Sequence, residues 1–170
     1  AGLPAGVLNI VHCGGPNCGA AIVAHPDIKA ISFTGSTRAG KEIAATAAPM
    51  FKKISLELGG KNPNLIFADC DWDKMMRTTI RSSFSNQGQI CLCGSRILIE
   101  AGIYEKFKKE FAERSKQLSV GDPLLADSKQ GAIVSKIHFD KVSQCIELAK
   151  QEGGTIVCGG RAVHLEGRCK

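Results

Sequence analysis

The sequence predicts an α/β fold, in which short strands alternate with helices that cross from one strand to the next. Two observations support this class. Apolar runs of strand length alternate with longer segments of helical periodicity along the 170 residues. Hydrophobic residues make up 44% of the chain and charged residues 22%, which suits a chain that buries a core.

Up to the glycine pair Gly59-Gly60, the pattern predicts strands that alternate with helices. The strands are expected at residues 6–11, 29–35 and 52–58, and the helices at residues 17–24 and 37–48. Pro49 ends the second helix, because proline lacks a backbone N–H and its ring clashes with the preceding turn. We expect the glycine pair to join two domains.

After the glycine pair the alternation starts again. Strands are expected at residues 63–68, 96–100 and 155–160, and helices at residues 72–86, 103–118 and 135–151. No internal repeat and no low-complexity segment interrupts this order. The second part therefore predicts another α/β arrangement.

Charge and composition exclude several classes of protein. The net charge of +6 comes from scattered lysines and arginines without a basic stripe, so we expect no nucleic-acid partner. The apolar runs are too short to span a bilayer, and no leader opens the chain. The eight cysteines lie far apart, which favours reduced thiols over a disulfide scaffold. These features predict a cytoplasmic protein without a membrane segment.

The motif FTGSTRAG lies where a predicted strand passes into a predicted helix. Gly35 permits a tight turn, and the unpaired N–H groups at the start of a helix attract anions such as phosphate. The spacing to Gly40 matches neither the G-x-G-x-x-G fingerprint nor a P-loop. By itself the motif fits a phosphate site or an ordinary strand-to-helix turn.

The motif LELGGKNP carries Glu57 near the end of a predicted strand. Strand alternation turns Glu57 away from the face of Leu56 and Leu58, toward solvent or a cleft. A partly buried carboxylate there would serve as a general base, whereas a fully exposed one would be an ordinary surface residue.

The motif SNQGQICLCGSR holds Cys91 and Cys93. Zinc would need two further ligands at suitable spacing, and His12 and His25 supply no such pattern, so we expect no metal site. The small residues before Cys91 are compatible with an exposed, nucleophilic thiol on a loop. Burial of either cysteine as an inert core residue is the alternative.

Taken together and in this order, FTGSTxxG, LELGGKNP and NQGQxC resemble the NAD(P)-dependent aldehyde dehydrogenase family, over essentially the whole chain. The resemblance implies a partial Rossmann-like coenzyme domain at residues 1–58, followed by part of the α/β catalytic domain at residues 59–170. The stretches LELGGKNPNLIFADCD and RSSFSNQGQICLCGSRI look most like the branch that oxidises 2-aminomuconate or 2-hydroxymuconate semialdehyde.

The resemblance also implies roles for the catalytic residues. Cys91 matches the nucleophile that attacks the aldehyde, and Cys93 falls at a non-catalytic position. Glu57 matches the general base that activates water to hydrolyse the thioester. The implied reaction converts an aldehyde to a carboxylic acid.

The coenzyme contacts follow in the same way. The resemblance assigns them to Gly35, Ser36, Gly40, Leu58 and Gly59. The expected cofactor is NAD; the choice between NAD and NADP is left open, because the strand end that discriminates them lies upstream of Ala1 in the family. The resemblance also implies a homo-oligomer when the protein is full length.

The family's chains are longer than this one, so we expect an internal fragment that is inactive in isolation. A catalytically inactive homologue, either truncated or structural and crystallin-like, is the alternative to an enzyme. A cysteine hydrolase is disfavoured, because no histidine lies in a pattern that would make it the partner of Cys91.

Overall fold

The computed structural model describes residues 2–165, so residues 1 and 166–170 of the two predicted domains lie outside the described part. The chain divides into two compact units, residues 1–60 and residues 61–170. Each unit contains one pair of parallel strands. The α/β class predicted from the sequence is confirmed. The assignment of the units to coenzyme and catalytic domains stays a prediction.

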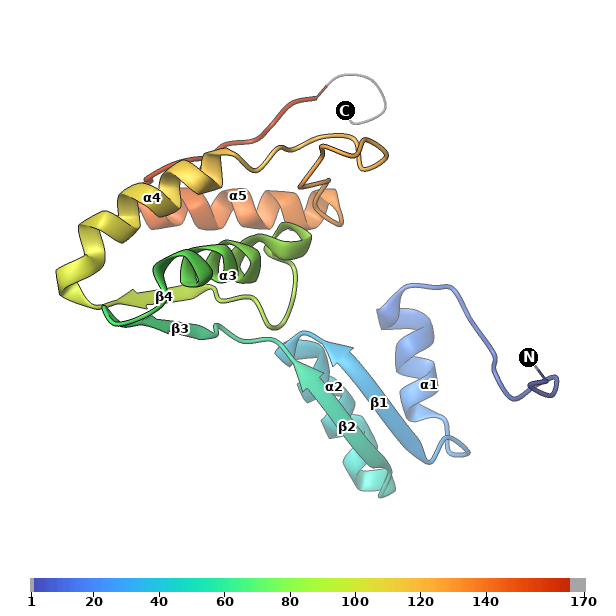
Figure 1. Ribbon diagram of the computed structural model, residues 1–170. Coiled ribbons are helices and arrows are strands. Elements are labelled where there is room, and N and C mark those ends of the chain that lie inside the picture. Colours follow the sequence, from blue (N-terminus) through green and yellow to red (C-terminus); the bar gives the residue numbers. More distant parts are fainter. Residues whose placement is uncertain (1, 166–170) are drawn as a thin grey trace. The chain divides into compact units, whose positions relative to one another are not determined.

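The first unit is a strand–helix–strand arrangement. Its elements are the π-helical turn Gly15–Gly19, α1 (Ala20–Ala24), β1 (Ala30–Gly35), α2 (Thr37–Ala47), the 3-10 turn Ala48–Met50 and β2 (Lys53–Leu58). The strands pair in parallel from Ala30 opposite Lys53 to Gly35 opposite Leu58. Helix α2 makes the crossover between them (Figure 1).

The ends of α2 follow from its sequence. The Ser36 hydroxyl accepts a hydrogen bond from the Ala39 N–H at 3.2 Å and so caps the first turn. The α-helix ends at Ala47, and Pro49 lies in the 3-10 turn that follows, as proline chemistry predicts. The cap fixes where β1 turns into the helix.

A buried lysine ties α1 to the strands of the first unit. Lys52 is only 8% exposed, and its ammonium donates hydrogen bonds to the carbonyls of Val23 at 2.5 Å and His25 at 2.6 Å. These carbonyls lie at the C-terminal end of α1, where the helix dipole favours a positive charge. Lys52 therefore anchors α1 beside the start of β2.

The second unit pairs a short parallel sheet with helices. Its elements are β3 (Pro63–Ile66), α3 (Trp72–Phe84), the 3-10 turn Ser85–Gly88, β4 (Arg96–Ile99), the 3-10 turn Ala101–Ile103, α4 (Tyr104–Lys116) and α5 (Lys136–Gln151). The register runs from Pro63 opposite Arg96 to Ile66 opposite Ile99. Helix α3 is the crossover (Figure 1).

The core of the second unit lies between the sheet, α3 and α4. Ile66, Met76 and Phe107 are its buried centre. The half-buried apolar residues packed against it are Cys70, Trp72, Met75, Ile97, Ile99, Ile103 and Phe111. The core thus fixes α3, the helix that leads into the cysteine loop.

Polar contacts hold α3 against α4. The Trp72 indole N–H donates to Glu110 at 2.7 Å, and the Arg114 guanidinium bonds the same carboxylate at 2.5 Å. The hydrogen bond from Trp72, together with the nearby charge of Arg114, lowers the pKa of Glu110. Lys106 lies 3.8 Å from the centre of the Trp72 ring.

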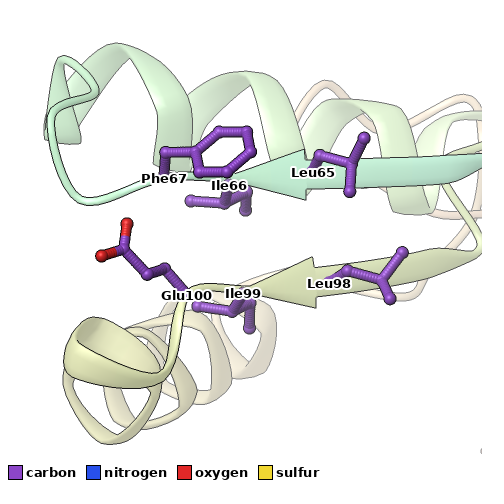
Figure 2. A pocket seen from close by; sticks show the side chains of 6 residues that line it. All are labelled: Leu65, Ile66, Phe67, Leu98, Ile99 and Glu100. Carbon is purple, nitrogen blue, oxygen red and sulfur yellow. The ribbon is translucent and has the colours of Figure 1, made fainter.

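The sheet of the second unit has one open face. A hollow of about 200 Å³ lies at the ends of β3 and β4. Figure 2 shows the side chains that line it, including Leu65 and Leu98, which are opposite each other in register and so share one face of the sheet. Leu65 is 64% exposed and Leu98 51%, whereas Ile66 is buried. Alternation along each strand therefore gives one core face and one uncovered apolar face.

Two predicted strands are wrong. Residues 6–11 and 155–160 form no strand in the described part of the chain. A strand requires a neighbour that completes its ladder of hydrogen bonds, and neither segment pairs with one. Their apolar residues gave the right composition for strands, but composition does not supply a partner.

The other elements were predicted, with shifted ends. Helix α3 stops at Phe84 rather than residue 86, because Asn86 and Gln87 adopt left-handed backbone angles with φ of 49° and 56°. None of the described helices has the length and apolar character to cross a membrane.

Replacement of Lys52 tests the anchoring of α1. Lys52→Met keeps the apolar stem but leaves the carbonyls of Val23 and His25 without their donor. We expect amide hydrogen exchange in residues 20–24 to become roughly tenfold or more faster, because a hydrogen bond to a charged group contributes about 1.5–3 kcal/mol. Mass spectrometry of the exchanged peptides measures this.

Lys53→Met is the matched control, because Lys53 is the exposed neighbour on β2 and its side chain makes no hydrogen bond within residues 2–165. Equal exchange in the two variants would contradict the anchoring role of Lys52.

Candidate active site

Cys91 lies in a tight turn between the 3-10 turn Ser85–Gly88 and β4. The Cys93 N–H donates to the Ile90 carbonyl at 3.0 Å and closes the turn. Cys91 is exposed at the turn, whereas Cys93 is only 7% exposed. The turn therefore presents one thiol to solvent and packs the other inside.

The side chain of Asn62 holds this turn. Its amide nitrogen donates to the Cys91 carbonyl at 2.6 Å and to the Cys93 carbonyl at 3.1 Å. The Arg96 N–H donates to the Asn62 carbonyl at 3.2 Å, where β4 begins. The cysteine loop is thus attached to the residues that lead into β3.

The segment before Cys91 is held from the other side. Gln87 has left-handed backbone angles, which cost roughly 1–2 kcal/mol for a residue with a Cβ. Its N–H donates to the Gln130 side chain at 3.1 Å, and the Gln89 side chain accepts from the Val134 N–H at 3.1 Å. Contacts with residues 130–134 offset the local cost.

The loop also packs on α3. The Gly94 N–H donates to the Ser82 hydroxyl at 3.1 Å, and the Ser83 hydroxyl donates to the Gly94 carbonyl at 3.4 Å. A Cβ at position 94 would lie 2.8 Å from the Ser82 Oγ, so glycine is needed for this approach. The helix and the loop together enclose an open hollow of about 400 Å³.

Glu57 lies in the first unit, one residue before the end of β2. It is exposed, whereas Leu56 and Leu58 are half-buried, as strand alternation predicts. It pairs in register with Thr34 of β1. Its carboxylate is therefore accessible to water, as that of an ordinary surface glutamate is, so the role of general base stays a prediction that rests on the family resemblance.

The predicted coenzyme residues gather at the carboxyl ends of β1 and β2. Gly35 is paired with Leu58 at the last register position, Ser36 caps α2, and Gly59 directly follows β2. A Cβ on Gly40 would lie 2.7 Å from Leu58 Cδ2. Gly40 thus lets α2 pack closely on β2. These residues all belong to the first unit, whereas Cys91 belongs to the second.

The first turn of α2 suits an anionic group. It contains no acidic residue, and the N–H groups of Thr37 and Arg38 have no hydrogen-bond acceptor among residues 2–165. Such a helix start after a parallel strand fits the phosphates of a dinucleotide. In the described part of the chain, no three His, Cys, Asp or Glu side chains gather as metal ligands would.

Comparison with known proteins decides the family. Residues 1–169 match the profile of the Aldehyde dehydrogenase family. The chain belongs to the aldehyde dehydrogenase family. The fold and the sequence resemblance agree on this family.

Several curated relatives of the chain share a name. The chain is 50% identical over 159 residues to 2-aminomuconic semialdehyde dehydrogenase of Danio rerio, covering 94% of the chain and 33% of the relative. It is 48% identical over 160 residues to 2-aminomuconic 6-semialdehyde dehydrogenase of a Pseudomonas species, with 94% and 33% covered. The chain therefore spans about a third of the length of these relatives.

Solved structures of other aldehyde dehydrogenases share the fold. Aldehyde dehydrogenase C of Pseudomonas syringae, a mutant in complex with NAD+ and octanal, matches with a TM-score of 0.90 and 37% identity, over 95% of this chain and 33% of that one. Betaine aldehyde dehydrogenase of Staphylococcus aureus, in complex with NAD+, matches with a TM-score of 0.86 and 35% identity, over 90% and 30%.

Sequence reasoning missed the residues that hold the cysteine loop. Asn62 is inside the motif LELGGKNP, but nothing in the motif shows which carbonyls its amide would reach. Gln130 and Val134 lie outside every motif. The left-handed potential of the run Asn86-Gln87-Gly88 was the available signal for a sharp turn before Cys91.

Asn62→Asp tests the brace on the cysteine loop. Aspartate has the shape of asparagine, but its carboxylate donates no hydrogen bond and repels the carbonyls of Cys91 and Cys93. We expect amide exchange in residues 90–95 to become about tenfold or more faster, measured by hydrogen-exchange mass spectrometry.

Asn64→Asp is the control, since the Asn64 amide donates to the Thr79 hydroxyl at 3.3 Å instead of to the loop. If amide exchange in residues 90–95 were the same in Asn62→Asp as in the unmodified protein, the two hydrogen bonds of Asn62 would not be what holds the loop.

Proposed function

We propose that the full-length protein containing this segment oxidises an aldehyde to a carboxylic acid with NAD. The observation that carries this proposal is the Cys91 turn. Its thiol is exposed, its neighbour Cys93 is packed inside, and Asn62 holds the carbonyls of both residues. A nucleophile on a braced turn reacts from a defined position.

In the proposed reaction, the Cys91 thiolate adds to the aldehyde carbon and forms a thiohemiacetal. The Cys91 backbone N–H has no acceptor among residues 2–165, so it is available to the developing oxyanion. Oxidation leaves the acyl group on the sulfur as a thioester. Cysteine suits both steps, because thiolates are strong nucleophiles and thioesters hydrolyse readily.

Glu57 is the proposed general base. Its exposed carboxylate takes a proton from the water that attacks the thioester, which releases the carboxylic acid and regenerates the thiol. Its position next to Leu58, at the carboxyl end of β2, is where ligands bind in parallel α/β sheets.

NAD, when bound, supplies the hydride acceptor that the oxidation needs. The residues proposed to hold it are Gly35, Ser36, Gly40, Leu58 and Gly59. The uncapped N–H groups at the start of α2 suit its phosphates. The NAD+ complexes of the similar solved structures support this choice over NADP.

The proposed substrate is a muconic-type semialdehyde. The relatives from Danio rerio and the Pseudomonas species, at 50% and 48% identity, bear the name of this substrate class. A cytoplasmic location and assembly into homo-oligomers are part of the same proposal.

We further propose that the 170 residues alone have negligible dehydrogenase activity. The open sheet face with Leu65 and Leu98 supports this, because so much exposed apolar surface on a short sheet disfavours a stable, isolated unit. The chain also spans only 33% of its relative from Danio rerio.

Two single replacements in the full-length protein test the nucleophile. With NAD and a semialdehyde, Cys91→Ala should lower turnover at least about 1,000-fold, followed by NADH absorbance. Cys93→Ala is the matched control two residues away, and it should keep most of the activity.

The proposal fails if the unmodified full-length protein makes no NADH from any aldehyde of a broad panel. It fails equally if Cys91→Ala turns over as fast as Cys93→Ala.

A further inference from the structure

The hollow beside the cysteine loop has two chemically different walls. One wall comes from the loop and is apolar, formed by Ile90, Leu92 and Cys93. The other wall comes from α3 and from Ser85, which directly follows it, and it carries a cation and hydroxyl groups, from Thr78, Arg81, Ser82 and Ser85. A ligand that fits both walls has an apolar chain and an anionic end.

The α3 residues of this wall share one face of the helix. Positions 78, 81 and 82 follow the spacing i, i+3 and i+4, which brings their side chains into one row, and Ser85 continues the wall at the residue after the helix. The opposite face carries Met76 and Thr79, which are buried. The polar wall is thus fixed by the packing of the helix core.

Arg81 is the charged group of this wall. It is exposed, and its guanidinium makes no hydrogen bond or ion pair with any of residues 2–165. A guanidinium offers a planar fork of donors that matches both oxygens of a carboxylate. Arg81 therefore has its donors available for a ligand.

Of the hydroxyl groups of this wall, the Ser85 hydroxyl is used within the fold, whereas the Ser82 hydroxyl has a proton left for a ligand. The Ser85 hydroxyl donates to the Arg81 carbonyl at 2.7 Å, so its proton is already used. The Ser82 hydroxyl accepts from the Gly94 N–H at 3.1 Å, and its own proton has no acceptor within residues 2–165. Ser82 can therefore donate a second hydrogen bond beside Arg81.

The apolar wall includes the neighbours of the nucleophile. Ile90 and Leu92 flank Cys91 directly, and Leu92 is 79% exposed. The volume of about 400 Å³ lies in the range of small-molecule sites. The two residues that flank Cys91 in the chain therefore line the same hollow as Arg81.

We propose that Arg81, assisted by the Ser82 hydroxyl, binds the carboxylate of the substrate and makes the enzyme selective for aldehydes with an anionic far end. This inference rests on the proposed function and deepens it, because it assigns the residue that recognises the substrate class. A muconic-type semialdehyde has both an aldehyde and a carboxylate.

The test uses the full-length protein and a pair of substrates with equal chain length. Glutarate semialdehyde carries a carboxylate opposite its aldehyde, and pentanal does not. For Arg81→Gln we expect the KM of glutarate semialdehyde to rise about tenfold or more, with the kcat little changed. The KM of pentanal should stay within about twofold, because it makes no contact with the charge.

A series of replacements at position 81 distinguishes the loss of the charge from a general disturbance of the fold. Along Arg81→Lys, Arg81→Gln and Arg81→Glu, the KM of glutarate semialdehyde should rise stepwise while pentanal turnover stays constant. Arg77→Gln is the matched control, since Arg77 is exposed one turn earlier on α3 and does not line the hollow. It should leave both substrates unchanged.

The inference is overturned if Arg81→Gln changes neither KM, changes both equally, or is reproduced by Arg77→Gln. These outcomes are distinct from failure of the proposed function. The proposed function itself fails if the unmodified protein makes no NADH from either aldehyde, or if Cys91→Ala still oxidises pentanal. The inference about Arg81 then fails together with the proposed function.

Discussion

The geometry of the candidate site depends on one amide side chain. The Asn62 nitrogen has two protons, and it donates one to the Cys91 carbonyl and one to the Cys93 carbonyl. Pro63 begins β3 immediately after Asn62, so the turn is attached to the edge of the core sheet. The attached turn is the one in which Cys91 is exposed and Cys93 is packed inside. Ile90 and Leu92 of the same loop line the hollow together with residues of α3.

In the first unit, too, a few specific contacts fix the positions of the elements. Its strands end together at Gly35 and Leu58, and Gly40 lets α2 approach β2 without a clash. Lys52 secures α1 at the opposite end of β2. The carboxyl ends of both strands are therefore left to carry the residues of the proposed coenzyme site. In each unit, a few polar or glycine contacts set the position of the residues that are proposed to be functional.

Most of the fold could be predicted from local pattern, because strand alternation and helix caps act over a few residues. In the structure, the side chains of Ser36 and Asp71 accept hydrogen bonds from the first turns of α2 and α3, which are interactions of this local kind. The strands at residues 6–11 and 155–160 could not be judged this way, since a strand depends on a partner elsewhere. The role of Asn62 was hidden for the same reason. Helical spacing alone places Arg81 and Ser82 on one face of α3, but only the folded loop turns that face into a hollow.

In the proposed reaction, Cys91 carries the acyl group as a thioester that Glu57 helps to hydrolyse. The most direct measurement uses the full-length Glu57→Gln variant, mixed with NAD and a semialdehyde, quenched in acid and digested for mass spectrometry. We predict an acyl adduct on the peptide that contains Cys91, assigned to that residue by fragmentation and removed by hydroxylamine. An adduct on Cys93, or NADH formation without any adduct on Cys91, would contradict it.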